Sequence, residues 1–162
     1  MLKIINSLTP FFEDCYRRIN VREYAKIQNI SPPTASTTLK HYQKENLLKK
    51  STFKNYIFFH ANQSKEFIDL SRIYWSIKLK PVLDQIETLD PTIILFGSLS
   101  KAETTEKSDI DLAIFSPIKS KVPKSLKNRE IQAHHYKSIK DIKNKELLNN
   151  ILNGYILKGR IR

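Results

Sequence analysis

Cysteine and glycine are scarce in this chain of 162 residues, and no long apolar run is present. The single cysteine, Cys15, excludes an intramolecular disulfide and a cysteine-based zinc cluster, which fits a reducing compartment. No stretch approaches the ~20 consecutive apolar residues of a membrane-spanning helix. The N-terminus turns polar quickly, unlike a signal peptide or membrane anchor. We therefore expect a cytoplasmic protein without a membrane association.

Positive charge predominates in the sequence. The chain has 28 Lys and Arg against 16 Asp and Glu, a formal net charge of +12. Such an excess attracts polyanions, whether nucleic acid, nucleotide phosphates or an acidic membrane surface. Charge alone does not choose among them, and lysines that are merely solvated are the alternative explanation. A hydrophobic content of 40% is ordinary for a globular protein and allows a core in each half.

The N-terminal half predicts helices followed by a hairpin. Apolar periodicity places three helices and a pair of strands, in order, at residues 8–19, 21–29, 33–48 and 51–61. Thr9 would cap the first helix, with Pro10 in its first turn, and Ser31 would cap the third. The strands would flank a turn at Lys54 and Asn55.

This order of elements resembles the winged-helix regulators over about residues 8–61, although no unique motif supports the resemblance. It implies a winged helix-turn-helix domain over residues 1–62 whose third helix enters the major groove of double-stranded DNA. Between Arg17 and Lys54 the sequence has nine Lys or Arg and two acids. The residues expected to contact DNA are Thr34, Ser36, Thr37, Thr38, Lys40, His41 and Lys44 on the helix, and Lys54 at the turn. The alternative is a helix-turn-helix that contacts protein.

A change of pattern after residue 62 predicts a connecting helix and a second domain. Helical spacing continues to Leu89 and is interrupted by Pro81, so we expect a connecting helix at 63–82, of a kind that commonly joins two copies of a winged-helix protein. We expect strands at residues 92–98, 108–116 and 129–136. A loop or short helix is expected at 117–128, and a closing helix at 140–157. The predicted fold class is α+β, with a small mixed sheet in the domain at 83–162.

A phosphate-binding turn is predicted at the end of the first of these strands. Gly97, one of three glycines, directly follows a buried type of strand, where a missing side chain lets the backbone approach a phosphate. Ser98 would add a hydroxyl and an amide at a helix N-terminus.

Two acids on the next strand are the candidate metal ligands. Asp109 and Asp111 are two residues apart, so their side chains project from the same face of a strand with Cα atoms ~7 Å apart. Both carboxylates can then reach one or two divalent cations, while Ile110 and Leu112 point into the core. Taken alone, an Asp-x-Asp pair is more often an exposed strand edge.

The Gly97-Ser98 pair, followed by Ser-Asp-Ile-Asp-Leu from Ser108, resembles the signature of the minimal nucleotidyltransferases of the polymerase-beta superfamily. The resemblance covers about residues 83–159. It implies Mg²⁺ (or Mn²⁺) held by Asp109 and Asp111, and a nucleoside triphosphate held by Gly97, Ser98 and Ser108. The implied enzyme transfers a nucleoside monophosphate to a hydroxyl of a protein, an RNA or a small molecule.

Two departures from that pattern leave other functions open. Ala102 stands where such proteins often have a second glycine. They also usually supply a third carboxylate, and Gln132 occupies the aligned place, with Glu130 two residues earlier on the same strand face as the candidate catalytic base. Because glutamine is not a base, a DNA-binding regulator that binds nucleotide without chemistry is one alternative, and an antitoxin-like partner of another protein is a second.

Two histidines lie near the end of the same strand. His134 and His135 are adjacent, so they face opposite sides and at most one can join a given site. We expect a structural role for both.

Overall fold

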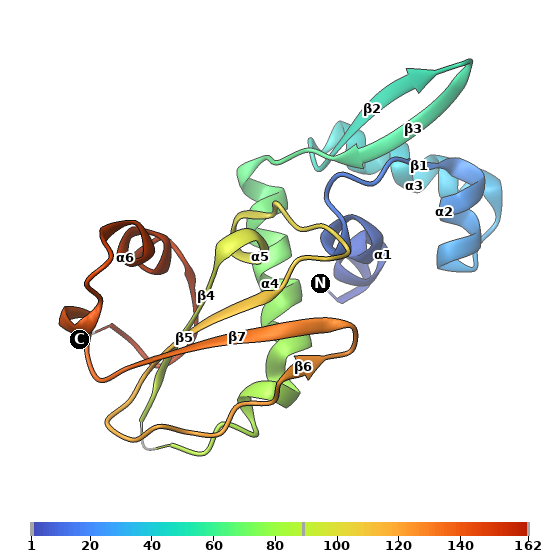
Figure 1. Cartoon of the computed structure of the whole chain (residues 1–162). Coiled ribbons are helices and arrows are strands. Elements are labelled where there is room, and N and C mark those ends of the chain that lie inside the picture. The colour runs from blue at the N-terminus through green and yellow to red at the C-terminus, as the bar shows by residue number, and fades with distance from the viewer. Residues whose placement is uncertain (1, 89, 162) are drawn as a thin grey trace. The chain divides into compact units, whose positions relative to one another are not determined.

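The computed structural model describes residues 2–88 and 90–161, which divide into two compact units (Figure 1). The N-terminal unit comprises the residues up to Ser71 together with 102–106, and the C-terminal unit comprises Arg72–Lys101 and the residues from Lys107 onward. Leu89, at the end of the predicted helical pattern, lies outside the described residues, as do the two terminal residues. Within the described ranges, no helix combines the length and the apolar character needed to cross a membrane.

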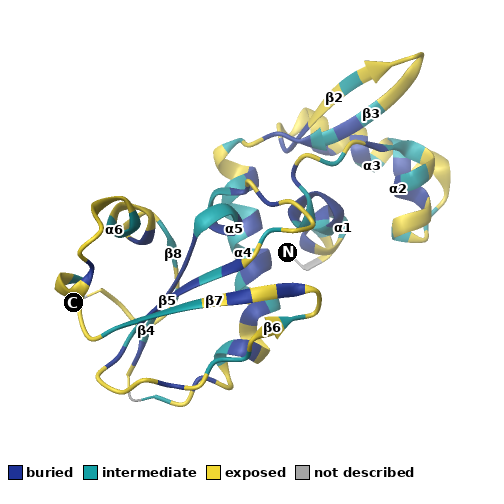
Figure 2. Ribbon diagram, viewed as in Figure 1, coloured by how far each residue is buried: buried dark blue, intermediate teal, exposed yellow. Residues whose placement is uncertain are grey.

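Three helices and a small sheet form the N-terminal unit. The helices are α1 (Leu2–Glu13), α2 (Val21–Gln28) and α3 (Pro32–Lys44). The strands β1 (Ile19–Asn20), β2 (Leu48–Phe53) and β3 (Tyr56–Ala61) form an antiparallel sheet in the order β1-β3-β2. The core is built from fully buried side chains that include Leu8, Phe11, Tyr24, Leu39 and Phe59. Figure 2 shows that burial is confined to the base of the hairpin, and its outer part is exposed.

Local capping groups set the ends of α2 and α3. The side chain of Asn20 accepts a hydrogen bond from the Glu23 amide at 3.0 Å, and that of Ser31 accepts one from the Thr34 amide at 3.3 Å. Asn29 ends α2 in the left-handed conformation, with φ 52°. The predicted cap at Ser31 is confirmed.

The first helix differs from the prediction of 8–19. It begins earlier, so Pro10 lies inside α1 rather than in its first turn. It ends at an Asx turn, because the Asp14 carboxylate accepts hydrogen bonds from the amides of Tyr16 and Arg17 at 3.0 and 3.1 Å. The chain then enters β1, a short strand that periodicity did not predict, and Tyr16 is 59% exposed instead of facing the core.

The third helix also ends before the predicted residue 48. Asn46 adopts a left-handed conformation with φ 59°, and its carbonyl accepts a hydrogen bond from the Asn62 side-chain amide at 2.7 Å. This turn releases Leu48 into β2, where it pairs with Ala61. The predicted hairpin is confirmed, with a two-residue turn between Phe53 and Tyr56.

One long helix leads into the C-terminal unit. This helix, α4 (Lys65–Leu83), contains Pro81 in its last turn and ends two residues later, consistent with the missing amide donor of proline. The division between the compact units falls within α4, after Ser71. The domain boundaries suggested at 62 and 82 stay a prediction.

The C-terminal unit is a mixed five-stranded sheet in the order β6-β7-β5-β4-β8. Its elements are β4 (Thr92–Phe96), α5 (Gly97–Lys101), β5 (Ile110–Phe115), β6 (Ser125–Leu126), β7 (Arg129–Tyr136), a 3-10 helix (Ile139–Asp141), α6 (Lys145–Leu152) and β8 (Tyr155–Lys158). Strand β5 runs parallel to β7 and antiparallel to β4.

Two of these strands were not predicted. Strand β6 lies in the segment expected to be a loop or short helix, and β8 lies in the expected closing helix. The helical pattern ends where the chain must pass close to β4: a Cβ on Gly154 would lie 2.6 Å from the Leu95 carbonyl oxygen. The following residues then pair with β4 as its outer neighbour. Residues whose apolar spacing predicted a helix thus form a strand, because they pair with β4.

The two faces of the sheet have different coverings. On one face, the Arg129 guanidinium lies 5.3 Å from the ring centre of Trp75, which belongs to α4. On the other face, Ile94, Phe96 and Ala113 form a core cluster with Ile151 of α6. Phe96 pairs with Asp111, so the predicted metal ligand belongs to this second face.

Candidate active site

The end of β4 brings Gly97 against the carboxylate of Asp111. Gly97 follows β4 directly and has φ 70°, a conformation that L side chains rarely adopt. A Cβ placed on Gly97 would lie 2.2 Å from Asp111 Oδ2 and 3.1 Å from its Cγ. Because such a contact is impossible, this position requires glycine. The missing side chain is the reason that the carboxylate and the bare backbone lie side by side.

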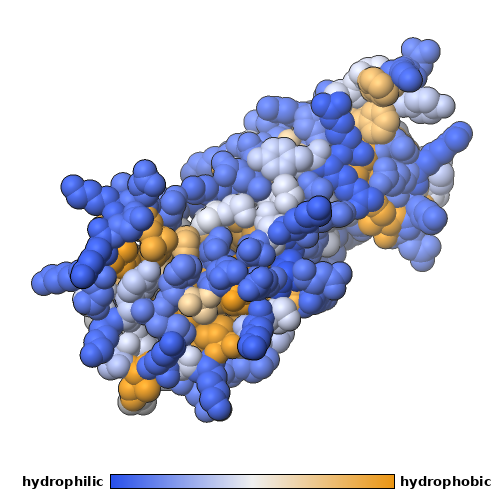
Figure 3. Space-filling view, viewed as in Figure 1, coloured by the Kyte–Doolittle hydropathy of each residue, from blue (hydrophilic) through white to orange (hydrophobic). Residues whose placement is uncertain are grey.

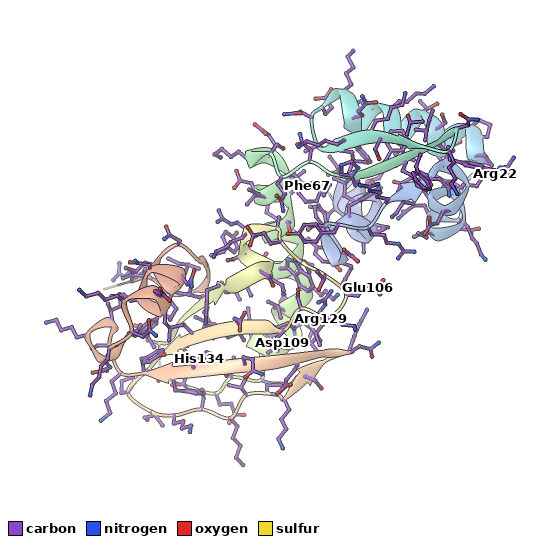
Figure 4. All side chains as sticks on the ribbon, turned by 45° about the horizontal axis from the view of Figure 1, so that its top comes forward. Arg22, Phe67, Glu106, Asp109, Arg129 and His134 are labelled. Atoms are coloured by element: carbon purple, nitrogen blue, oxygen red, sulfur yellow. The ribbon has the colours of Figure 1, made fainter. Side chains whose placement is uncertain are left out.

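The residues around the two acids alternate between buried and more exposed positions, as predicted. Ile110 and Leu112 are fully buried, whereas Asp111 is half-buried and Asp109, just before β5, is exposed. Asp109 lies at the start of β5 in Figure 4. The acidic positions therefore lie at the sheet edge where β5 begins and β4 ends.

Burial is the main influence on the ionisation of Asp111. Burial raises the pKa of the Asp111 carboxyl above its ordinary value of 3.8, His134 opposes this rise, and the neighbouring carboxylate of Asp109 adds to it. A bound cation would relieve both the desolvation and the repulsion.

These two carboxylates fit a magnesium ion. Mg²⁺ is commonly bound through one or two protein carboxylates together with substrate phosphates, so Asp109 and Asp111 are a sufficient protein contribution. The open backbone at Gly97 leaves room for a phosphate beside them. Within residues 2–88 and 90–161, no group of three or more His, Cys, Asp or Glu side chains is arranged to hold a metal by itself.

Arg129 is hydrogen-bonded to the backbone just before the acidic strand β5. Its side chain is almost completely buried, and it donates a hydrogen bond of 2.6 Å to the carbonyl of Ser108. Ser108 immediately precedes Asp109, so this bond fixes the backbone from which Asp109 projects. The same guanidinium packs over Trp75. Arg129 was not among the predicted site residues, although its position two residues before the buried Ile131 indicates the covered face of β7.

The parallel pairing of β5 with β7 places Gln132 beside Asp111. The register pairs Asp111 with Gln132 and Ala113 with His134. The amide of Gln132 therefore stands next to Asp111, where a third carboxylate would complete the acidic site. Glu130 lies two residues earlier on the same face, is exposed, and pairs with Ser125 of β6.

His134 belongs to the same face as the acids. Its ring lies 5.6 Å from that of Phe96, and its charge acts on Asp111. The structural role expected for His134 stays a prediction. Figure 4 shows His134 farther along β7 than Arg129. On the opposite face, burial lowers the pKa of His135, and Lys119 and His134 add to the effect.

The predicted phosphate residues lie at the same edge as the acids. Ser98 is half-buried in α5, which has only five residues and therefore offers little helix dipole. Its contribution to phosphate binding would come from its own amide and hydroxyl. Ala102, in the place of a second glycine, is fully buried in the left-handed conformation with φ 56°, and its carbonyl accepts a hydrogen bond from the Gln63 side chain at 2.9 Å.

A cavity of about 470 Å³ lies at the other end of the sheet. Thr92 and Phe115, which pair with each other at the start of β4 and the end of β5, line it together with Lys137 and Arg160. The candidate site residues lie at the opposite end of the same strands and do not line this cavity.

In the N-terminal unit, the residues predicted to contact DNA separate into two sets. Thr34, Thr37, Thr38 and His41 line a groove of about 920 Å³ that they share with residues of α1, Tyr24 and Tyr42. The Thr37 hydroxyl also donates a hydrogen bond to the Pro33 carbonyl at 3.1 Å. Lys40 and Lys44 are exposed elsewhere on α3, Ser36 is half-buried, and Lys54 lies in the hairpin turn.

Residues 76–153 match the family model described as the nucleotidyltransferase domain. The matched segment begins in α4, ends after α6, and contains the Gly-Ser turn and both aspartates of the candidate site. The resemblance inferred for the C-terminal part of the chain is thereby confirmed at the level of a nucleotidyltransferase domain. No curated protein matches the sequence.

Proposed function

We propose that the C-terminal unit binds a magnesium–nucleoside triphosphate at Gly97, Ser98, Asp109 and Asp111, and transfers the nucleoside monophosphate to a hydroxyl group. The observation that carries the proposal is the position of the Asp111 carboxylate, which occupies the space that a side chain on Gly97 would need. Metal ligand and phosphate-accessible backbone are therefore adjacent. The family match supports the reaction class.

Each residue of the site has a role in this reaction. Asp109 and Asp111 would hold the metal, Mg²⁺ or Mn²⁺, which when bound supplies neutralising charge for the transferred phosphoryl group. Ser98, with help from the Ser108 side chain, binds phosphate oxygens. The acceptor hydroxyl attacks the α-phosphorus, pyrophosphate leaves, and Glu130 accepts the hydroxyl proton.

One observation favours a second function, a regulator that binds nucleotide without transferring it. Gln132 stands directly beside Asp111, where a carboxylate would serve as a base. An amide neither accepts the proton of the acceptor nor adds charge for a second metal. In this case nucleotide binding would alter the affinity of the N-terminal unit for its own ligand, because coupling between two sites is reciprocal.

We propose further that the N-terminal unit is a winged-helix domain that binds double-stranded DNA. Support comes from the succession of helices and a terminal hairpin, from the exposed Lys40 and Lys44 on α3, and from Lys54 at the hairpin turn. If these lysines contact phosphates, the plot of log affinity against log salt should flatten by about 0.9 for each contact removed. Lys121→Ala in the C-terminal unit is the control, and an unchanged slope in Lys40→Ala and Lys44→Ala would contradict the assignment.

The transfer reaction is tested with the full chain and nucleoside triphosphates labelled at the α-phosphate. Incorporation of label into RNA and protein fractions is compared for the natural chain, Asp109→Ala and the control Asp84→Ala, which removes an exposed acid elsewhere in the same unit. We expect incorporation to vanish in Asp109→Ala and to persist in the control. Label transfer that survives Asp109→Ala would remove the proposed role of this residue. Magnesium-dependent nucleotide binding without any transfer would favour the regulator.

A further inference from the structure

The tip of the β2–β3 hairpin exposes a pair of aromatic rings. Phe53 and Tyr56 are cross-strand partners and are 59% and 66% exposed. The turn between them, Lys54-Asn55, has positive φ at both residues (45° and 64°), as in the tight two-residue turn that matches the twist of a hairpin. Both rings therefore belong to the same face of the hairpin tip and are open to solvent. Figure 3 shows apolar surface over this hairpin, surrounded by hydrophilic side chains.

Behind the tip, the same face of the hairpin carries a further aromatic residue and then two basic ones. Cross-strand pairs two residues apart share a face, so the Phe53–Tyr56 pair is followed by Ser51–Phe58 and then by Lys49–His60. We call these six residues the aromatic-basic face. The hairpin from 48 to 61 contains three lysines and no acid. Arg18 is also close, since its charge and that of Lys49 add to the burial that lowers the pKa of His60.

A groove borders the tip of this face. It has a volume of about 770 Å³ and lies between the hairpin and the start of α2, where Arg22 and Lys26 line it together with Asn55 and Tyr56. One acid, Glu23, also lines the groove, and its carboxylate forms an ion pair with Arg17 at 2.7 Å. Arg22 lies at the hairpin end of the unit in Figure 4. Cationic side chains thus flank the exposed Tyr56 ring, an arrangement in which a phosphate and a stacked base can bind side by side.

We propose that the aromatic-basic face binds unpaired bases of a nucleic acid. Bases would stack on Phe53 and Tyr56, and the adjoining phosphates would contact Lys49, Lys54 and Arg22. Exposed rings attract base faces, which are free in a single strand or an opened duplex but are covered by neighbouring base pairs in an intact one. An apolar protein surface is the less suitable occupant, because it would have to cover the surrounding lysines without supplying counter-charge.

This inference rests on the proposed nucleic-acid binding of the N-terminal unit, and names the form of nucleic acid that the hairpin prefers. The test uses the full chain and fluorescent DNA of about 16 nucleotides, the upper site size of a small single-strand-binding fold, as a single strand, a perfect duplex and a duplex with a central unpaired bubble. We expect tighter binding to the single strand and the bubble than to the duplex. Phe53→Ala and Tyr56→Ala should each weaken binding to unpaired DNA by about tenfold, with little effect on the duplex.

A matched control and a direct probe of stacking complete the experiment. Tyr16 is as exposed as Phe53 but lies outside the hairpin, so Tyr16→Ala should leave every affinity unchanged. A 2-aminopurine in the bubble should lose fluorescence on binding the natural chain and recover it with Tyr56→Ala. Equal affinity for duplex and unpaired DNA, unaffected by the two hairpin variants, would overturn this inference while leaving duplex binding intact. Binding to none of the three probes would overturn both proposals.

Discussion

Gln132 stands beside Asp111 in the parallel pair β5–β7, so Gln132→Glu would place a third carboxylate next to the two acids of the candidate site. If the missing carboxylate is what limits the reaction, this substitution should raise the rate of nucleotide transfer. General-base catalysis typically contributes about 10²- to 10⁴-fold. Because Glu130 is already the proposed base, the lower end of this range, about a hundredfold, is the largest increase expected. The same substitution should strengthen magnesium binding.

The cost of the substitution without metal follows from the sheet geometry. Neighbouring strands lie about 4.8 Å apart, which separates the new carboxylate from that of Asp111 by roughly 5–6 Å. Two like charges at this distance repel by roughly 1 kcal/mol when solvated and about 3 kcal/mol at an effective dielectric constant near 20. Because Gln132 is exposed, the smaller value applies. The metal-free variant should therefore be destabilised by about 1 kcal/mol, and magnesium should reverse the loss.

Two assays measure these effects. Transfer of α-labelled nucleotide gives the rate, and thermal unfolding over a magnesium titration gives the stability and the apparent metal affinity. Gln132→Asn is the matched control, because it keeps an uncharged amide at this position. The control should show neither the faster transfer nor the larger stabilisation by magnesium.

A specific pair of results would refute this reasoning. If Gln132→Glu neither speeds transfer nor binds magnesium more tightly, the position beside Asp111 is not the missing acid. If in addition Glu130→Gln abolishes transfer in the natural chain, the base is Glu130.

Three further predictions concern the same site. Gly97→Ala should abolish nucleotide binding and lower the free energy of unfolding by about 1–2 kcal/mol, since a left-handed backbone and the Asp111 carboxylate both oppose a side chain. Gly159→Ala, at φ 76°, meets the same backbone strain and a clash with the Pro91 carbonyl oxygen, which would lie 2.4 Å from the new Cβ, so it should lose stability but keep nucleotide binding. Equal loss of nucleotide binding in both variants would contradict the assignment. Asp111→Asn should stabilise the metal-free protein at neutral pH. Burial raises the pKa of Asp111 in the folded chain above 3.8, so the protonated side chain favours folding at a pH below the unfolded pKa. This contribution to the free energy of unfolding is lost as the pH rises through the folded pKa, whereas asparagine stays uncharged. Thermal unfolding from about pH 3 to pH 8 should show that the variant becomes more stable than the natural chain only as the pH rises. A stability difference that does not change with pH would argue against burial of the Asp111 charge as its cause. Arg129→Met should lower the free energy of unfolding in urea by about 1–3 kcal/mol and weaken metal binding, because the Ser108 carbonyl loses its hydrogen-bond donor. If neither the stability nor the metal affinity changed, this hydrogen bond would not position the acidic strand.

Short-range patterns were sufficient for several parts of the molecule. The cap at Ser31, the hairpin turn at Lys54-Asn55, and the burial of Ile110 and Leu112 on either side of Asp111 all agree with the sequence predictions. Each depends on groups within a few residues of one another: a side chain bonding a nearby amide, a two-residue turn, or the alternation of a strand. The sequence by itself also determined that the Gly97-Ser98 turn follows a buried strand and that Asp111 lies on the next strand.

The tertiary structure decided what lies beside those residues. Apolar periodicity does not distinguish the strand β8 from a helix, because the difference is whether the edge of β4 is available for pairing. The neighbour of Asp111 is likewise set by the register between β5 and β7, which are separated by a long connection, and that register selects Gln132. The contact of Asp111 with Gly97 also required the pairing of β4 with β5. Pairing between distant segments is a property of the whole sheet, so only the folded chain shows which side chains share the site.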